Sequence, residues 1–238
     1  MTELANRIQD LDWDELRRTL DEQGWAVTPK LLSAGECQEL AALYDDDGDG
    51  RFRSVIDMRR HRFGSGVYKY FDTPLPAPVQ QLRRALYKPL AEVANEWAER
   101  LDSEERFPAS LGKFLDHCHE QGQSRPTPLI FRYGEGDFNA LHQDVYGEVG
   151  FPFQALIVLS RPGRDFTGGE FLLVTQQPRA QSVGEAISLE QGQVLLFPNR
   201  QRPAQGTRGW YRVNVRHGVS RVRSGTRHTL GIIFHDAE

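Results

Sequence analysis

After Pro126 the sequence is made of short β-rich runs separated by glycines and prolines, and this texture constrains the fold more than any other feature. The run lengths and the β-branched and aromatic residues within them are typical of strands. The runs fall at residues 128–133, 152–160, 169–174, 193–198, 211–217 and 227–235, with shorter ones near 140–146 and 184–189. Together they predict a mainly β fold whose core, a double-stranded β-helix or jelly roll, spans residues 126–238.

Residues 1–125 show the periodicity of helices instead. Apolar side chains recur every three or four residues over 79–101, which predicts a long helix bent by Pro89. The other elements expected here are helices at 11–20, after the cap residue Ser33 and at 108–121, with a short strand at 25–28. We expect this helical region to pack on one sheet of the core, so that the whole chain forms one compact domain.

Composition excludes several classes of protein. The mean hydropathy is −0.56, and no apolar run approaches the length of a membrane span. The first ten residues lack the basic and apolar regions of a signal peptide. Cys37 and Cys118 are far apart and are expected to be free thiols in a reducing compartment. These features predict a cytoplasmic protein that does not contact membranes, and they leave its oligomeric state open.

Three residues of the β region have the composition of a metal site. His142 and Asp144 form a His-x-Asp triplet, and His217 ends a strand-like segment. Two imidazoles and one carboxylate can hold Fe(II) on one face and leave other positions open for a co-substrate and O2. Strand alternation puts His217 on the inward face with Val213 and Val215. An inward histidine there is either a satisfied core residue or a ligand.

Arg227 favours the second alternative. In residues 227–234 a period of two places Arg227 and Thr229 on one face and the apolar Leu230 and Ile232 on the other. An arginine turned into a barrel needs an anion, because an unpaired buried charge is too costly to persist. A dicarboxylate co-substrate would supply that anion.

This pattern resembles the Fe(II)/2-oxoglutarate-dependent dioxygenases, in which an arginine about one strand after the distal histidine binds the far carboxylate of 2-oxoglutarate. The segment 133–136 is similar to the Tyr-x-x-Gly segment of the prolyl-hydroxylase-like branch, and 167–171 to its Gly-Gly-Glu turn. The segment 192–197 is similar to its Gly-Asp-x-x-x-Phe strand, with Gln193 in place of the acid. These motifs cover about residues 126–238.

The resemblance implies an oxidoreductase that couples oxidative decarboxylation of 2-oxoglutarate to hydroxylation of a C–H bond. It implies that His142, Asp144 and His217 bind Fe(II). It also implies that Arg227, assisted by Thr229 and Tyr133, binds 2-oxoglutarate, so that the catalytic residues are His142, Asp144, His217 and Arg227. O2 is the other co-substrate, and ascorbate is an expected reductant.

Further segments at 52–54, 68–71, 141–148 and 231–237 resemble a bacterial oxygenase family described as acting on alkylated nucleic acid in the manner of AlkB-like demethylases. Oxidative demethylation of nucleic acid is therefore one hypothesis. A second is hydroxylation of a peptide, an amino acid or another small molecule, which the prolyl-hydroxylase-like motifs favour. A third, a non-catalytic sensing barrel, is disfavoured by the intact ligand set.

The distribution of charge bears on the substrate. Residues 1–50 carry 13 acidic and 4 basic residues, 51–69 carry six bases against Asp57, and 191–235 carry eight arginines and no acid. Basic stretches can follow a phosphate backbone, and aromatic residues among them can stack on a flipped base. The candidate substrate residues are Arg59, Arg60, Arg62, Tyr68, Lys69 and Tyr70. The alternative is that these arginines form a solvated face or pair with the acidic N-terminal helices.

Overall fold

The computed structural model describes residues 3–46, 48–144 and 147–238. Within them the helices are α1 (Glu3–Gln9), α2 (Trp13–Gln23), α3 (Ala34–Ala42), α4 (Met58–His61), α5 (Ala77–Arg100) and α6 (Leu111–Glu120), with short 3-10 turns η1 (Leu43–Asp45) and η2 (Gly48–Gly50). The strands are β1 (Ala26–Val27), β2 (Phe52–Asp57), β3 (Gly64–Ser65), β4 (Val67–Phe71), β5 (Leu129–Tyr133), β6 (Phe138–His142), β7 (Phe153–Val158), β8 (Phe166–Gly168), β9 (Phe171–Gln176), β10 (Val183–Ile187), β11 (Val194–Pro198), β12 (Gln201–Gly206), β13 (Gly209–Val219), β14 (Val222–Gly225) and β15 (Arg227–Ile233).

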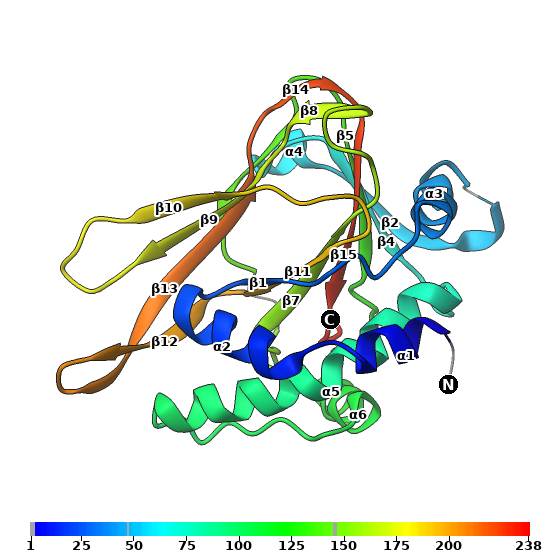
Figure 1. Cartoon of the computed structure of the whole chain (residues 1–238). Coiled ribbons are helices and arrows are strands. Elements are labelled where there is room, and N and C mark those ends of the chain that lie inside the picture. Colours follow the sequence, from blue (N-terminus) through cyan, green and yellow to red (C-terminus); the bar gives the residue numbers. More distant parts are fainter. Residues whose placement is uncertain (1–2, 47, 145–146) are drawn as a thin grey trace.

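The strands form two main antiparallel sheets (Figure 1). The first has the order β1-β11-β7-β15-β5-β4-β2, and the second has the order β10-β9-β13-β6-β3, with β12 paired to β13. The short pair β8 and β14 lies at one end, close to α4 (Figure 1). The prediction of a mainly β, jelly-roll fold with N-terminal helices is confirmed.

The predicted strands correspond to β5, β6, β7, β9, β10, β11, β13 and β15. The run predicted at 140–146 is represented by β6, and its residues 145 and 146 lie outside the described residues. The predicted helices correspond to α2, α3, α5 and α6, and β1 occupies the short strand expected at 25–28. Ser33 and Glu36 form the capping box expected before α3.

Residues 1–125 contribute strands to the sheets as well as the expected helices. β2 and β4 extend the first sheet, and β3 pairs with β6 in the second. The alternation in this segment is weak because β2 is an edge strand whose side chains are mostly half-buried or exposed. Charged residues are common on such edges, where they prevent pairing with other chains.

The first sheet separates two hydrophobic layers. On β15, Leu230 and Ile232 pack with α5 and the other helices, whereas Ile233 belongs to the layer between the sheets. β7 is buried along its whole length because it has helices on one side and the second sheet on the other. Helices α1, α2, α5 and α6 lie together on the outer side of this sheet (Figure 1). The inner face of β15 therefore points toward the space between the sheets.

In the described part of the chain, no helix combines the length and the apolar character that crossing a bilayer requires.

Candidate metal and co-substrate site

Two neighbouring strands bring the histidines together. β6 and β13 are antiparallel, and His142 lies directly opposite His217 in their register. The centres of the two imidazole rings are 4.3 Å apart. The register shifts immediately after His217, at Gly218, where an added Cβ would lie 2.7 Å from the carbonyl oxygen of Asn139. A glycine there lets the two strands approach closely enough to pair the histidines.

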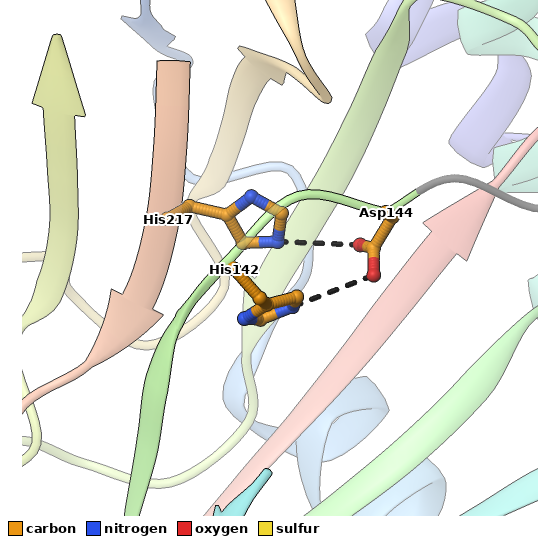
Figure 2. Close-up of side chains that lie close together, drawn as sticks. All are labelled: His142, Asp144 and His217. Carbon is orange, nitrogen blue, oxygen red and sulfur yellow. Dashed lines mark ion pairs between the residues drawn. The ribbon is translucent and has the colours of Figure 1, made fainter. Parts of the chain in front are cut away.

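Asp144 completes the cluster from the segment that follows β6. Its Oδ1 lies 3.4 Å from Nε2 of His142, and its Oδ2 lies 3.2 Å from Nε2 of His217, as the dashed lines of Figure 2 mark. Each of the three residues offers one ligand atom, and these atoms all lie within 4.8 Å of one another. Both rings turn the same nitrogen toward one carboxylate (Figure 2). The three donors converge on one point.

Surrounding hydrogen bonds orient these side chains. The Nδ1 of His142 is 2.8 Å from the carbonyl oxygen of Ala140. Because a carbonyl only accepts, Nδ1 carries a proton, so Nε2 is the nitrogen that can offer a lone pair to a metal ion once it is deprotonated. The buried Gln154 on β7 donates to Oδ2 of Asp144 at 2.6 Å. The amide of Gln143 donates to the carbonyl oxygen of Val215 at 2.8 Å, which ties the triplet to β13.

The electrostatics of the cluster favour a cation. Burial alone would raise the pKa of Asp144, but hydrogen bonds from the two histidines hold it well below its usual range. Burial lowers the pKa of His217, which disfavours its protonated form. The Nδ1 of His217 is buried and has no hydrogen-bond partner in the described segments. An ionised carboxylate and two imidazole nitrogens on one side of a metal position are ligands that suit a divalent ion such as Fe(II).

Arg227 is a buried cation at the start of β15. It is 1% exposed, lies opposite Tyr133 in the register of β15 and β5, and its Nη1 donates to Oγ1 of Thr229 at 3.4 Å. Its Nε has no hydrogen-bond partner within residues 3–46, 48–144 and 147–238. Burial lowers the pKa of Arg227 to about 10, so it is charged at neutral pH. The predicted parity of Arg227 and Thr229 is confirmed.

The surroundings of Arg227 leave space for an anion. Its guanidinium lies 5.5 Å from the ring centre of Tyr133 and 5.8 Å from that of Phe166. It lines a hollow of about 220 Å³ beside the Gly-Gly-Glu turn, where an added Cβ on Gly169 would lie 2.8 Å from its Cδ. Phe171 lies in the wall of this hollow and also in the wall of the cavity above the histidines.

The cavity above the histidines has a volume of about 270 Å³. Its polar lining includes His142, Asp144, Gln154 and His217. Most of the remaining lining is apolar or aromatic, and its residues include Met58, Phe63, Tyr68, Tyr70, Leu129, Phe131 and Tyr133. The rings of Tyr68 and Tyr70 are nearly perpendicular, with centres 5.4 Å apart. The chamber therefore suits a flat, weakly polar group held beside the donor cluster.

The six candidate substrate residues lie in three different parts of the structure. Tyr68 and Tyr70 line the cavity. Lys69, between them on β4, points to the other side of the sheet, where its Nζ donates to the carbonyl oxygen of Tyr44 at 2.8 Å. The three arginines lie on α4 and at its C-terminal end, where all are exposed.

The arginines of α4 do not pair with the acidic N-terminal helices through any ion pair of the described residues. Arg59 lies 3.2 Å from Asp137, and Arg60 lies 3.8 Å from Asp57. Their side chains remain 71% and 82% exposed, so these pairs leave most of each guanidinium available.

Sequence reasoning missed Gln154, Phe63 and Gly218. Gln154 did carry a signal, since it is a polar residue inside the otherwise apolar run of β7. Phe63 and Gly218 carried none, because their roles depend on which strands become neighbours.

Comparison with known proteins identifies a family whose model matches this chain. The model of the Oxygenase-NA family, described as an oxygenase catalysing oxidative methylation of damaged DNA, matches residues 66–237. The chain is also 50% identical over 189 residues to an uncharacterized protein of Mycobacterium tuberculosis, in strains CDC 1551 and H37Rv, which covers 79% of this chain and 78% of the relative.

Solved structures share the fold. A prolyl-4-hydroxylase from Pseudomonas putida is 17% identical with a TM-score of 0.56, over 95% of this chain and 99% of that one. An oxidoreductase of the 2OG-Fe(II) oxygenase family from Burkholderia pseudomallei is 17% identical with a TM-score of 0.53, over 94% and 91%. The α-ketoglutarate-dependent epimerase SnoN is 14% identical with a TM-score of 0.53, over 92% and 80%. These titles name different reactions, so the shared fold does not fix the substrate.

Proposed function

The chain belongs to this oxygenase family and is an Fe(II)- and 2-oxoglutarate-dependent oxygenase, and from that premise we propose that it removes methyl groups from alkylated nucleic acid by oxidation. An oxygenase inserts oxygen into a C–H bond, so an N-methyl group becomes N-hydroxymethyl. That product releases formaldehyde and leaves the unmethylated base. Oxygen insertion into a methyl group therefore leads to loss of that methyl group from the base, and not to methylation of the base.

The donor cluster supports the choice of cofactor. His142, Asp144 and His217 would hold Fe(II), with Gln154 orienting the carboxylate and Ala140 the first imidazole. When bound, the ion supplies activation of O2 for insertion of one oxygen atom into the substrate, while 2-oxoglutarate takes up the other and becomes succinate and CO2.

Arg227 supports the choice of co-substrate. Its buried guanidinium requires an anion, and a carboxylate is the natural partner of that planar group. Thr229 lies beside it on the same face of β15, and Tyr133 lies opposite it on β5. We assign these three residues to the far carboxylate of 2-oxoglutarate.

The observation that carries the substrate proposal is the aromatic lining of the cavity next to an exposed basic helix. Tyr68, Tyr70 and Phe131 present ring faces and edges to a planar group, and a base can stack on such side chains. The exposed arginines of α4 follow directly on Met58, which lines the same cavity. Phosphates can meet these arginines while a base enters the chamber.

Two measurements test the proposal. Anaerobic addition of Fe(II) and 2-oxoglutarate is expected to give a weak visible charge-transfer band that Asp144→Ala abolishes. The aerobic enzyme is expected to release formaldehyde from an oligonucleotide containing 1-methyladenine. A normal band without formaldehyde from any methylated oligonucleotide would reject the nucleic-acid substrate and favour a prolyl-hydroxylase-like reaction on a peptide, an amino acid or another small molecule. Ascorbate is included in parallel assays to see whether it sustains turnover.

The role of the basic helix is tested by salt. Replacing Arg59, Arg60 and Arg62 with glutamine is expected to weaken binding of the oligonucleotide and reduce its salt dependence by up to about three counterions. The control replaces Arg106, Arg179 and Arg208, which are exposed and carry the same charge but lie on other loops. An equal effect of both triple variants would show that only net charge matters.

A further inference from the structure

Phe63 is an exposed aromatic side chain at the mouth of the cavity. It is 48% exposed and also forms part of the cavity wall. Its ring stacks on that of His61, with centres 5.4 Å apart and planes 19° from parallel. Single exposed apolar side chains are common on protein surfaces, but this one also lines the cavity that contains the donor cluster.

The backbone holds Phe63 firmly in this exposed place. Its carbonyl oxygen accepts a hydrogen bond from the amide of Ala140 at 2.8 Å, and its own amide donates to Met58 at 3.1 Å. The next residue, Gly64, has a φ of +135°, and an added Cβ would lie 2.3 Å from the carbonyl oxygen of Phe138. Phe63 is thus fixed to the strand that carries His142, at a set position relative to the donor cluster.

Basic residues from two distant parts of the sequence converge around Phe63. Arg59 contacts Asp137, while Arg221 donates to the carbonyl oxygen of Gly136 at 2.5 Å and lies over the ring of Phe138. The turn at 134–137 therefore joins α4 to the start of β14, which Figure 1 shows at the same end of the molecule. We call Arg59, Arg60, Arg62, Arg221 and Arg223 the basic rim, and all five are exposed.

The cavity geometry imposes a condition on a nucleic-acid substrate. The donor cluster is made of half-buried and buried residues inside this cavity, so a methyl group on a stacked and paired base cannot reach it. The base must leave the helix, and the resulting gap favours an apolar or aromatic group that stacks on its neighbours. Among the described residues, Phe63 is the exposed aromatic residue that lies both on the cavity wall and next to the basic rim.

We propose that Phe63 is a wedge that stacks on the bases flanking an extruded nucleotide in a double-stranded substrate, while the basic rim holds the two phosphate backbones. This inference rests on the proposed function, and it adds a specific preference: the protein opens duplexes rather than only accepting single strands. The stacking energy of Phe63 offsets part of the cost of unstacking.

The test compares one methylated sequence as a duplex and as a single strand, with 2-aminopurine beside 1-methyladenine. Phe63→Ala is expected to lower the ratio of kcat/KM on the duplex to that on the single strand about tenfold, because an aromatic stack is lost. The rise in 2-aminopurine fluorescence on binding the duplex is expected to be lost as well. Phe63→Tyr should restore both, whereas Phe63→Leu should restore neither fully, since leucine has no ring to stack.

Val183→Ala is the matched control, because Val183 is 60% exposed on β10, far from α4 in Figure 1. An unchanged ratio and fluorescence in Phe63→Ala, with an active parent enzyme, would overturn the wedge alone. A parent enzyme inactive on both the duplex and the single strand would overturn the proposed function, and the wedge with it. Equal loss on duplex and single strand would also reject the wedge, since it would place Phe63 in general binding.

Discussion

The side-chain amide of Gln154 donates a 2.6 Å hydrogen bond to Oδ2 of Asp144, and the strand that supplies it is buried on both faces. The carboxylate itself lies just beyond β6, next to residues outside the described segments. A side chain from a fully buried strand thus holds a candidate metal ligand that lies on a connecting segment. A rigid neighbour of this kind fixes which carboxylate oxygen is available to an ion.

Gln154→Leu is expected to weaken metal binding about 10- to 100-fold, because Asp144 loses the contact that orients it. The dissociation constant for Fe(II), or for Co(II) as an oxygen-stable probe, measures this directly. Gln177→Leu removes an amide at an exposed position and serves as the control. Equal metal affinity in Gln154→Leu and the parent protein would show that Asp144 is oriented by other contacts.

Gly218→Ala is expected to impair both folding and metal binding, because its Cβ would lie 2.7 Å from the carbonyl oxygen of Asn139. Separating β13 from β6 costs about 1–3 kcal/mol and moves His217 away from His142. Urea unfolding and metal titration check the two effects. Gly184→Ala on β10 is the control, since its added Cβ would meet nothing closer than 3.8 Å. If both alanine variants behave alike, close strand approach is not required.

Arg227→Met is expected to raise the free energy of unfolding of the ligand-free protein by about 1–4 kcal/mol. We expect an increase in stability because burial lowers the pKa of this guanidinium to about 10, below its ordinary value. The folded chain therefore binds the proton less tightly than the unfolded chain does, so the charge costs stability at every pH below about 10. The thermal shift produced by 2-oxoglutarate should disappear in the same variant. A destabilised variant that still responds to 2-oxoglutarate would contradict both statements.

His235 is expected to make the protein sensitive to acid. Burial, aided by the nearby charge of Arg83, lowers the pKa of His235 to about 4, and its Nδ1 accepts a hydrogen bond from the amide of Phe151 at 3.1 Å. The neutral ring is therefore the folded form, and the unfolded chain takes up a proton first as the pH falls. Stability should decline between about pH 6.5 and pH 4, by about 3 kcal/mol in total from this residue. His235→Asn should show a shallower pH dependence of unfolding than the parent protein, and equal slopes would exclude this cause.

Local patterns in the sequence predicted the parts of the site that depend on a single strand. The period of two correctly turned His217 inward with Val213 and Val215, and it separated Arg227 from Leu230. These predictions succeed because one face of each strand is buried, and a buried face leaves an alternating signal.

Contacts between side chains of different strands could not be predicted from the sequence. That Tyr133 lies opposite Arg227, or that Gln154 meets Asp144, depends on sheet order, which no local pattern encodes. Lys69 is a different case, because a period of two along its strand accounts for its position. It lies between two cavity tyrosines in sequence, yet strand alternation sends it to the opposite face, to Tyr44.

The two-faced packing of β15 has a consequence for how this chain can change in length. Inserting or deleting one residue inside the strand would turn every following side chain over, exchanging the cavity side for the helix-covered side. Leu230 would then turn toward the space between the sheets, and the polar Thr229 would turn toward the helix-covered core. Relatives that keep the same chemistry should accordingly gain or lose residues in the turns on either side of β15, and never within it. Spacing from Arg227 to the end of that strand thus offers a length criterion for recognising active relatives.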